Sequence, residues 1–229
     1  MCGRYSLEAR PDEIAEAFDA ANEFAFSARY NIAPTQSVPV VRVGTASGSR
    51  RIAMIRWGLT SHPDNPRPLI NARSETVARK PSFRQSFRSR RCLVPATGFF
   101  EWQKLGAAKQ PFHIRRADRG LFAFAGIWDE ALLGDGSTTE AFAILTTEPN
   151  RIMSPIHDRM PVILASEAWS TWLESDTPGN LSELLIPAPD GILTAIPVGN
   201  RVNSAAHDDP ACIEPLVRQA GGFSEQLFD

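Results

Sequence analysis

The second residue, Cys2, is expected to become a double nucleophile, because its small side chain predicts removal of Met1. The α-amine and the thiol of the new first residue would then share one Cα, which makes a 1,2-aminothiol. Ordinary pKa values of ~8 for the amine and ~8.5 for the thiol leave both with reactive fractions at neutral pH. An aldehyde can form a Schiff base with the amine, and the thiol can then close a thiazolidine ring intramolecularly. A chain terminus is usually unstructured, so Cys2 alone leaves an accidental cysteine open.

Two further segments place one polar residue inside an apolar run. Asn71 follows Leu69 and Ile70 and precedes a predicted helix, so it is either a capping residue or an amide that binds the reacting groups, with Arg73 nearby for a phosphate. Glu101 lies between two aromatic residues in a strand-like run. It is either an outward-facing strand residue or a desolvated carboxylate, whose raised pKa suits proton transfer near neutral pH.

A third polar segment is the His157-Asp158-Arg159 cluster, which is bracketed by Pro155 and Pro161. The prolines predict an ordered loop. The histidine is either satisfied by local hydrogen bonds or acts in acid/base chemistry or in orienting a substrate hydroxyl. The arginine would bind a phosphate. With Cys2, these segments supply the groups needed for covalent catalysis on a charged substrate.

Composition predicts an ordinary soluble protein. The chain has 229 residues, 43% hydrophobic and 22% charged, and it shows no linker, so we expect a single domain over 1–229 with its core at about 2–216. It has no apolar run that could span a membrane and no secretory signal, so we expect a cytosolic protein. The three cysteines have no zinc-ligand spacing, so we expect no metal and no cofactor.

The net charge of −2 hides a basic central segment. Residues 67–119 carry 13 Lys or Arg against 3 Asp or Glu, whereas residues 120–229 carry 4 against 16. A local excess of +10 is expected of a polyanion-binding face. A solvated surface paired with acidic neighbours in the fold would give the same pattern, so the charge alone does not decide.

Many short strands and a few helices have to position these residues. Apolar and β-branched runs predict strands at 38–43, 52–57, 92–95, 99–103, 112–116, 121–126, 141–147 and 193–198. Helical patterns cover 11–18, 74–91 with an interruption at Pro81, 166–173 with Ser166 as N-cap, and 181–185. Without βαβ alternation, this order indicates an α+β fold on a curved, barrel-like antiparallel sheet with flanking helices.

Taken together, the motifs resemble the SRAP (SOS-response-associated peptidase) family, whose members crosslink covalently to abasic sites in DNA. The resemblance runs from residue 2 to about 216 through seven ordered motifs. These are Met1-Cys2-Gly3-Arg4-Tyr5, Arg29-Tyr30-Asn31-Ile32-Ala33-Pro34-Thr35, Arg56-Trp57-Gly58-Leu59, Ile70-Asn71-Ala72-Arg73-Ser74-Glu75, Pro95-Ala96-Thr97-Gly98-Phe99-Phe100-Glu101-Trp102, Ile156-His157-Asp158-Arg159-Met160-Pro161 and Val202-Asn203.

The resemblance implies a role for each site residue. Cys2 would form a thiazolidine with the ring-opened aldehyde of an abasic site in single-stranded DNA. Asn71 would hold Cys2 and substrate, Glu101 would shuttle protons, and His157 would act on the hydroxyl of the opened sugar. The implied DNA contacts are Arg4, Pro34, Trp57, His62, Arg73, Trp102 and Arg159. We expect a monomer that shields the lesion during the DNA damage response.

One departure from the family pattern concerns base stacking. The family usually continues Ile-Pro-Ser-Trp after the Trp57 motif, whereas this chain continues Thr60-Ser61-His62-Pro63. The second tryptophan is therefore absent, and His62 is the residue placed to stack in its stead. Stacking contributes about 1–3 kcal/mol per base, so the departure bears on DNA affinity and not on the crosslinking chemistry.

Two other functions fit the same residues. An N-terminal-nucleophile amidohydrolase or self-processing peptidase would use the α-amine of Cys2 as a base for its own thiol. A passive nucleic-acid-binding module would use only the basic segment, and its binding would fall with salt and leave no covalent product. The passive module gives no role to Cys2, Glu101 or His157.

Overall fold

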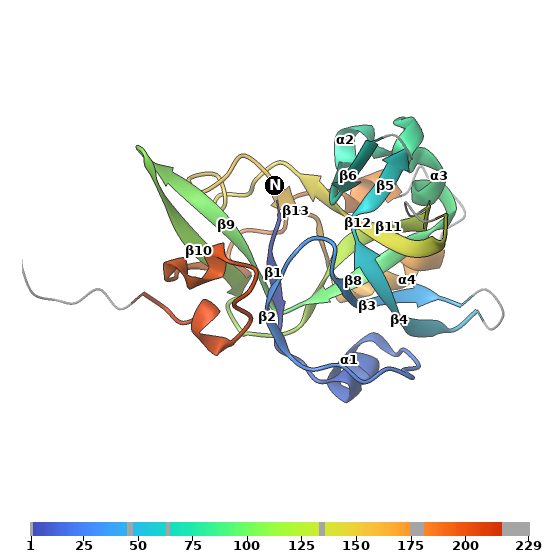
Figure 1. The fold of residues 1–229 in the computed structure, drawn as a ribbon, viewed down its shortest axis with the longest axis horizontal. Helices are drawn as coiled ribbons and strands as arrows, with labels where there is room; N and C mark the ends of the chain where they lie inside the picture. Colours follow the sequence, from blue (N-terminus) through green and yellow to red (C-terminus); the bar gives the residue numbers. More distant parts are fainter. Residues whose placement is uncertain (1, 45–47, 63–64, 133–135, 175–180, 217–229) are drawn as a thin grey trace, which may run out of the picture.

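The computed structural model describes residues 2–44, 48–62, 65–132, 136–174 and 181–216, with the backbone alone at 60–62, 65–66 and 131–132 (Figure 1). Five strands close into a barrel in the order β12-β4-β3-β8-β11, because β11 also pairs with β12. These strands are β3 Ser37–Val43, β4 Arg50–Trp57, β8 Arg91–Ala96, β11 Phe122–Leu132 and β12 Thr138–Thr147. Short strands add to the barrel: β7 Asn71–Arg73, β13 Met160–Pro161 and β14 Ile163–Leu164.

A second sheet has the order β15-β10-β9-β1-β2. Its strands are β1 Tyr5–Leu7, β2 Arg29–Ile32, β9 Gly98–Leu105, β10 Ala108–Arg116 and β15 Leu193–Pro197. A separate hairpin joins β5 Leu59–His62 to β6 Asn65–Leu69. The long β9–β10 hairpin projects from the body at the left of Figure 1.

The predicted α+β class and the barrel-like sheet are confirmed, but a wholly antiparallel sheet is wrong. β12 runs parallel to β4 and to β7. The chain between β4 and β12 is long enough to include helices and seven other described strands, and such a crossover is what parallel neighbours require. The barrel is therefore mixed.

The helices follow their sequence signals closely. Helix α1 Pro11–Phe18 begins at the predicted proline and buries Ile14 and Phe18. The predicted basic helix is two helices, α2 Ser74–Val77 and α3 Pro81–Ser89, since Pro81 starts the second one.

The late helices are shorter than predicted. A 3-10 turn at Ser166–Ala168 precedes α4 Trp169–Glu174, so Ser166 lies inside the turn and is not an N-cap. Further 3-10 helices cover Ser182–Leu184, Asn200–Asn203 and Pro210–Cys212. No helix within the described ranges is long and apolar enough to cross a membrane.

Three strand pairings bring the predicted site segments together. β1, which follows Cys2, pairs with β9, which carries Glu101. β7, which begins at Asn71, pairs with β12. β13, which follows the His157 loop, pairs with the end of the same β12. The second residue, Asn71, Glu101 and the histidine loop therefore converge at one end of the barrel.

Candidate active site

Cys2 is held in the interior by Asn71. The cysteine has no exposed surface in the chain that carries Met1. The side-chain amide Nδ2 of Asn71 donates a hydrogen bond to the backbone carbonyl of Cys2 at 2.8 Å. The amide oxygen Oδ1 of Asn71 is buried and has no hydrogen-bond partner among the residues that the structure describes. It is therefore an acceptor suited to an N–H donor beside Cys2.

The thiol of Cys2 is poorly suited to being a thiolate. Burial raises its pKa well above the usual range, and the negative charge of Glu101 raises the pKa further. Its hydrogen bond to the backbone carbonyl of Arg4 is long, at 3.7 Å. The thiol is therefore protonated at neutral pH and becomes a good nucleophile only toward a strongly electrophilic carbon.

Glu101 is a buried carboxylate with a raised pKa. Its side chain is 4% exposed. Burial raises the pKa of Glu101, while the neighbouring imidazole of His157 acts in the opposite direction. Its Oε2 lies 3.9 Å from Nε2 of His157. A buried carboxyl group with a raised pKa keeps its proton to a higher pH than an exposed one, which suits it to act as a general acid/base.

Two contacts compete for Nδ1 of His157. The backbone N–H of Arg159 donates to Nδ1 at 3.0 Å, which requires an unprotonated nitrogen, whereas a carboxylate oxygen of Asp158 lies 2.9 Å from it and favours a proton there. The side chain of Asp158 is 87% exposed and well solvated. We therefore assign the amide bond as dominant, which leaves the proton on Nε2, directed toward Glu101.

The predicted phosphate-binding arginines differ in how firmly they are held. Arg159 forms a bidentate pair with Glu75, at 2.5 and 3.0 Å, and donates to the carbonyl of Thr146 at 2.6 Å. Arg4 donates to Asn31 at 2.9 Å and to a backbone carbonyl at 2.8 Å. Arg73 is exposed at the start of α2 and has no ion-pair partner among the described residues. Of the three, Arg73 is the arginine that can reach a phosphate without breaking an existing contact.

The expected stacking surfaces need one correction. Trp57 has no exposed surface, donates to the carbonyl of Ile70 at 2.9 Å and packs edge-on against Tyr5, so it cannot stack on a base and the prediction that it contacts DNA is wrong. Trp102 is half-buried and donates to Asn203 at 2.8 Å. Phe99, an aromatic residue of the same motif as Trp102, is fully buried and offers no stacking surface either. The last two predicted DNA contacts are Pro34 and His62. Pro34 is half-buried in a turn, and the side chain of His62 lies outside the described part of the chain.

Sequence reasoning did not predict a buried chain of hydrogen-bonded polar side chains that links β1, the start of β9 and β10. Nε2 of His113 lies 3.0 Å from Ser6 Oγ, which lies 3.2 Å from Thr97 Oγ1, and Thr97 donates to the carboxylate of Glu8 at 3.2 Å. A carboxylate can only accept, so the donors run from His113 outward. Burial lowers the pKa of His113 to about 3, which keeps the ring neutral. A Cβ on Gly98 would lie 2.1 Å from this ring, so the strand needs glycine there.

Sequence reasoning also did not predict that residues 202–208 hold strand β2 in place beside the site. Asp208 forms an ion pair with Arg29 and accepts from the backbone amides of Tyr30 and Asn31 at 2.6 and 2.8 Å. Asn31 is buried and donates to three backbone carbonyls of residues 202–207. Asn31 lies in a motif that the resemblance had marked, whereas nothing local distinguishes Asp208 from its acidic neighbours.

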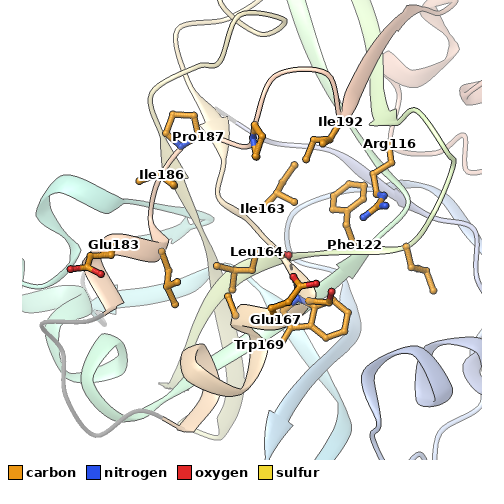
Figure 2. A pocket seen from close by; sticks show the side chains of 16 residues that line it. Arg116, Phe122, Ile163, Leu164, Glu167, Trp169, Glu183, Ile186, Pro187 and Ile192 are labelled. Carbon is orange, nitrogen blue, oxygen red and sulfur yellow. Dashed lines mark hydrogen bonds between the residues drawn. The ribbon is translucent and has the colours of Figure 1, made fainter.

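An apolar cavity of about 520 Å³ lies elsewhere in the molecule (Figure 2). Phe122, Ile163, Trp169 and Ile192 are among the side chains that line it, and none of the predicted site residues does. The chemistry predicted from the sequence therefore belongs to the polar end of the barrel and not to this cavity.

Comparison with known proteins identifies the family. A family model described as "SOS response associated peptidase (SRAP)" matches residues 1–205 of this chain. The chain belongs to the SRAP family. Among SRAP relatives, the abasic site processing protein YoqW of Bacillus subtilis is 36% identical over 224 residues, covering 93% of this chain and 99% of that protein. The abasic site processing protein YedK of Escherichia coli is 30% identical over 225 residues, covering 94% and 100%. A crystal structure of a Bacteroides thetaiotaomicron protein superposes with a TM-score of 0.84 at 27% identity, covering 94% of this chain and all of that chain.

Substituting Asn71 tests its hold on Cys2. We expect Asn71→Ala to lower the unfolding free energy by about 1–3 kcal/mol, because it leaves the buried carbonyl of Cys2 without a donor. Asn71→Asp preserves the shape but removes the donor, so it should cost at least as much. Urea unfolding of both variants measures the effect. Wild-type stability in both would show that the 2.8 Å contact contributes nothing.

Proposed function

We propose that this protein captures abasic sites in single-stranded DNA by a covalent thiazolidine at Cys2, after Met1 has been removed. The observation that carries the proposal is the hydrogen bond from Asn71 to the backbone carbonyl of Cys2 at 2.8 Å. The carboxylate of Glu101 is close enough to raise the pKa of the Cys2 thiol, and it lies 3.9 Å from Nε2 of His157. The names of the SRAP relatives YoqW and YedK supply the substrate, since both are called abasic site processing proteins. Shielding of the lesion during the DNA damage response follows from a stable adduct.

The reaction replaces the C=O of the aldehyde carbon with one C–N bond and one C–S bond, and it releases one water. The neutral α-amine of Cys2 attacks the aldehyde carbon of the ring-opened abasic sugar and forms a carbinolamine. A proton from Glu101 converts the carbinolamine hydroxyl into water, which leaves as the C=N bond of the Schiff base forms. The thiol sulfur then adds to the carbon of the protonated Schiff base, the C=N double bond becomes a C–N single bond, and the thiol proton returns to the carboxylate of Glu101. Reversal would need Glu101 to return these protons in the opposite order.

The order of attack follows from the pKa of the thiol. A buried thiol with a strongly raised pKa is a poor first nucleophile. An α-amine ordinarily has a pKa of ~8, and it needs only its neutral form to attack. The carbon of a protonated Schiff base is electrophilic enough for the thiol, which then reacts within the same residue. The same pKa argues against the amidohydrolase alternative, whose first step is thiol attack.

The remaining residues are proposed to place the DNA. The Nε2–H of His157 is directed toward Glu101 and can bind the hydroxyl released when the sugar opens. Arg73 is exposed for a flanking phosphate, and Trp102 offers a partly exposed ring beside Glu101. Arg4 and Arg159 would contact phosphates through those guanidinium N–H groups that their present hydrogen bonds do not use. Pro34 would shape the edge of the site.

Incubation with abasic single-stranded DNA tests the proposal. The DNA should carry one abasic site, and the matched control the same sequence with that base intact. We expect a protein–DNA adduct that survives denaturation with the abasic strand and none with the control. The adduct mass should equal protein without Met1 plus DNA minus one water. Failure of the wild-type protein to give this adduct, with Met1 shown to be absent by intact mass, would overturn the proposal.

A further inference from the structure

The cationic side chains of this protein differ in whether they have an acidic partner. Seven arginines form ion pairs with acids within the described ranges. They are Arg10, Arg29, Arg42, Arg90, Arg116, Arg159 and Arg201. The exposed cations without an acidic partner among the described residues gather mainly at two places, the tip of the β9–β10 hairpin and helices α2–α3.

The hairpin tip sets two like charges directly opposite each other. Lys104 on β9 pairs in register with Lys109 on β10, and both side chains are exposed. The two-residue turn begins at Gly106 with φ +59°, as a tight hairpin requires. Like charges directly opposite on neighbouring strands destabilise a hairpin. No acid of the described chain offsets this repulsion, so the arrangement suits an anion from outside.

Helix α3 also places like charges next to each other. Arg84 and Arg88 are exposed on one face, four residues apart, a spacing at which like charges repel. Arg79 and Lys80 extend the row toward α2, which begins next to the exposed Arg73. The helix itself contains no acidic residue. Its inward face is fully used by the buried phenylalanines of the helix, so the basic face is free for a partner.

The two basic groups lie on opposite sides of the candidate site. In Figure 1 the β9–β10 hairpin projects to the left, helices α2 and α3 lie at the upper right, and strand β1, which follows Cys2, lies between them. Glu101 is four residues from Leu105 at the end of β9, so the tip lies roughly 13 Å from the site along the strand. A polyanionic strand centred on Cys2 would therefore meet cations on both flanks.

We propose that these groups form two phosphate-binding arms, one for each flank of the lesion. The hairpin arm is Lys104 and Lys109, and the helix arm is Arg79, Lys80, Arg84 and Arg88. A single DNA strand would run from one arm across the site to the other, so that the two arms together hold the abasic nucleotide over Cys2. This inference rests on the proposed function for the identity of the strand. It goes further by assigning its path.

Non-covalent binding to one-sided oligonucleotides tests the path. The lesion is a tetrahydrofuran abasic analogue, which has no aldehyde, and about six nucleotides extend from it in the 5′ or the 3′ direction only. The hairpin variant is Lys104→Gln with Lys109→Gln, and the helix variant is Arg84→Gln with Arg88→Gln. Arg51→Gln with Arg119→Gln removes the same charge from exposed positions outside both arms and serves as the control. Affinity is measured by fluorescence anisotropy over a salt series.

We expect each arm variant to weaken binding to one flank only, with the two variants affecting opposite flanks. Loss of two phosphate contacts should lower the slope of log affinity against log salt by about 1.4 on that flank, since single strands give about 0.7 per contact. The control should match wild type on both. Equal losses on both flanks, or losses no larger than the control's, would overturn the path.

The covalent assay keeps this result separate from the proposed function. Flank-specific binding without any adduct on aldehyde-bearing DNA would support the arms and refute the Cys2 chemistry. An adduct formed by both arm variants at the wild-type salt dependence would refute the arms and leave the chemistry intact. All substituted positions are exposed, so folding should be unchanged, and thermal unfolding of each variant verifies it.

Discussion

Cys2→Ala and Cys2→Ser should each eliminate the denaturation-resistant adduct with abasic single-stranded DNA and leave only an adduct that reduction can trap. Alanine and serine both keep the α-amine, so each can form a Schiff base. Neither has a thiol to close the thiazolidine, and the open Schiff base hydrolyses. Denaturing gels with and without borohydride distinguish the two states. A stable adduct of wild-type yield from Cys2→Ala would remove Cys2 from the reaction.

The internal cysteines and Met1 provide the controls. Cys92→Ala and Cys212→Ala should crosslink like wild type, because an internal cysteine has no α-amine beside its thiol. A chain that retains Met1, verified by intact mass, should be as inactive as Cys2→Ala, since its first amine and the thiol then belong to different residues. Activity of the Met1-bearing chain would show that the thiol attacks first, despite the raised pKa of Cys2.

The strands that carry the site were predictable because their apolar patterning is local. The predicted runs at 92–95 and 99–103 correspond to β8 and β9, and α1 begins and ends where its proline and apolar face predict. Sequence reasoning missed the short strands, which include β2, β5 and β6 with four or five residues and β1, β7, β13 and β14 with two or three. Strands of that length carry no periodicity and exist because a neighbouring strand supplies their hydrogen bonds.

The convergence of the site residues could be expected only through the resemblance, not from spacing. Glu101 and His157 are 56 positions apart, and their approach depends on two separate pairings with β1 and β12. The error at Trp57 has a similar origin. A tryptophan beside a glycine and a basic residue looks the same in sequence whether its ring packs in the barrel or faces DNA, and here Tyr5 and Phe142 enclose it.

Glu101→Gln should slow adduct formation by about 10²–10⁴-fold, the usual contribution of a positioned acid/base group. Glutamine keeps the size and polarity of the side chain but cannot donate a proton to the departing water. Gel-based rates on abasic single-stranded DNA at several pH values measure the loss. The wild-type rate should depend on pH through Glu101 and the amine, whereas the variant should keep only the dependence of the amine. Equal rates and equal pH profiles would exclude Glu101 from proton transfer.

The same substitution should make the protein more stable at neutral pH. Burial raises the pKa of Glu101 in the folded state, so its contribution to stability is full below the ordinary carboxyl pKa and is lost as pH rises through the raised value. Glutamine has no charge to desolvate, so its advantage in unfolding free energy should grow as pH rises from about 4 toward 8.

Glu75→Gln gives the control of opposite sign. The hydrogen bond from Arg159 lowers the pKa of Glu75, so this carboxylate stabilises the fold above its ordinary pKa and loses that effect as pH falls through the lowered value. Its side chain is half exposed, so the effect should be small. Urea unfolding across pH should therefore show Glu101→Gln gaining on wild type as pH rises, and Glu75→Gln falling slightly behind. If Glu101→Gln holds a constant difference from wild type at all pH values, the carboxyl is not desolvated in the folded state. The site would then lack the desolvation that keeps this carboxyl protonated to a higher pH and so available as a proton donor.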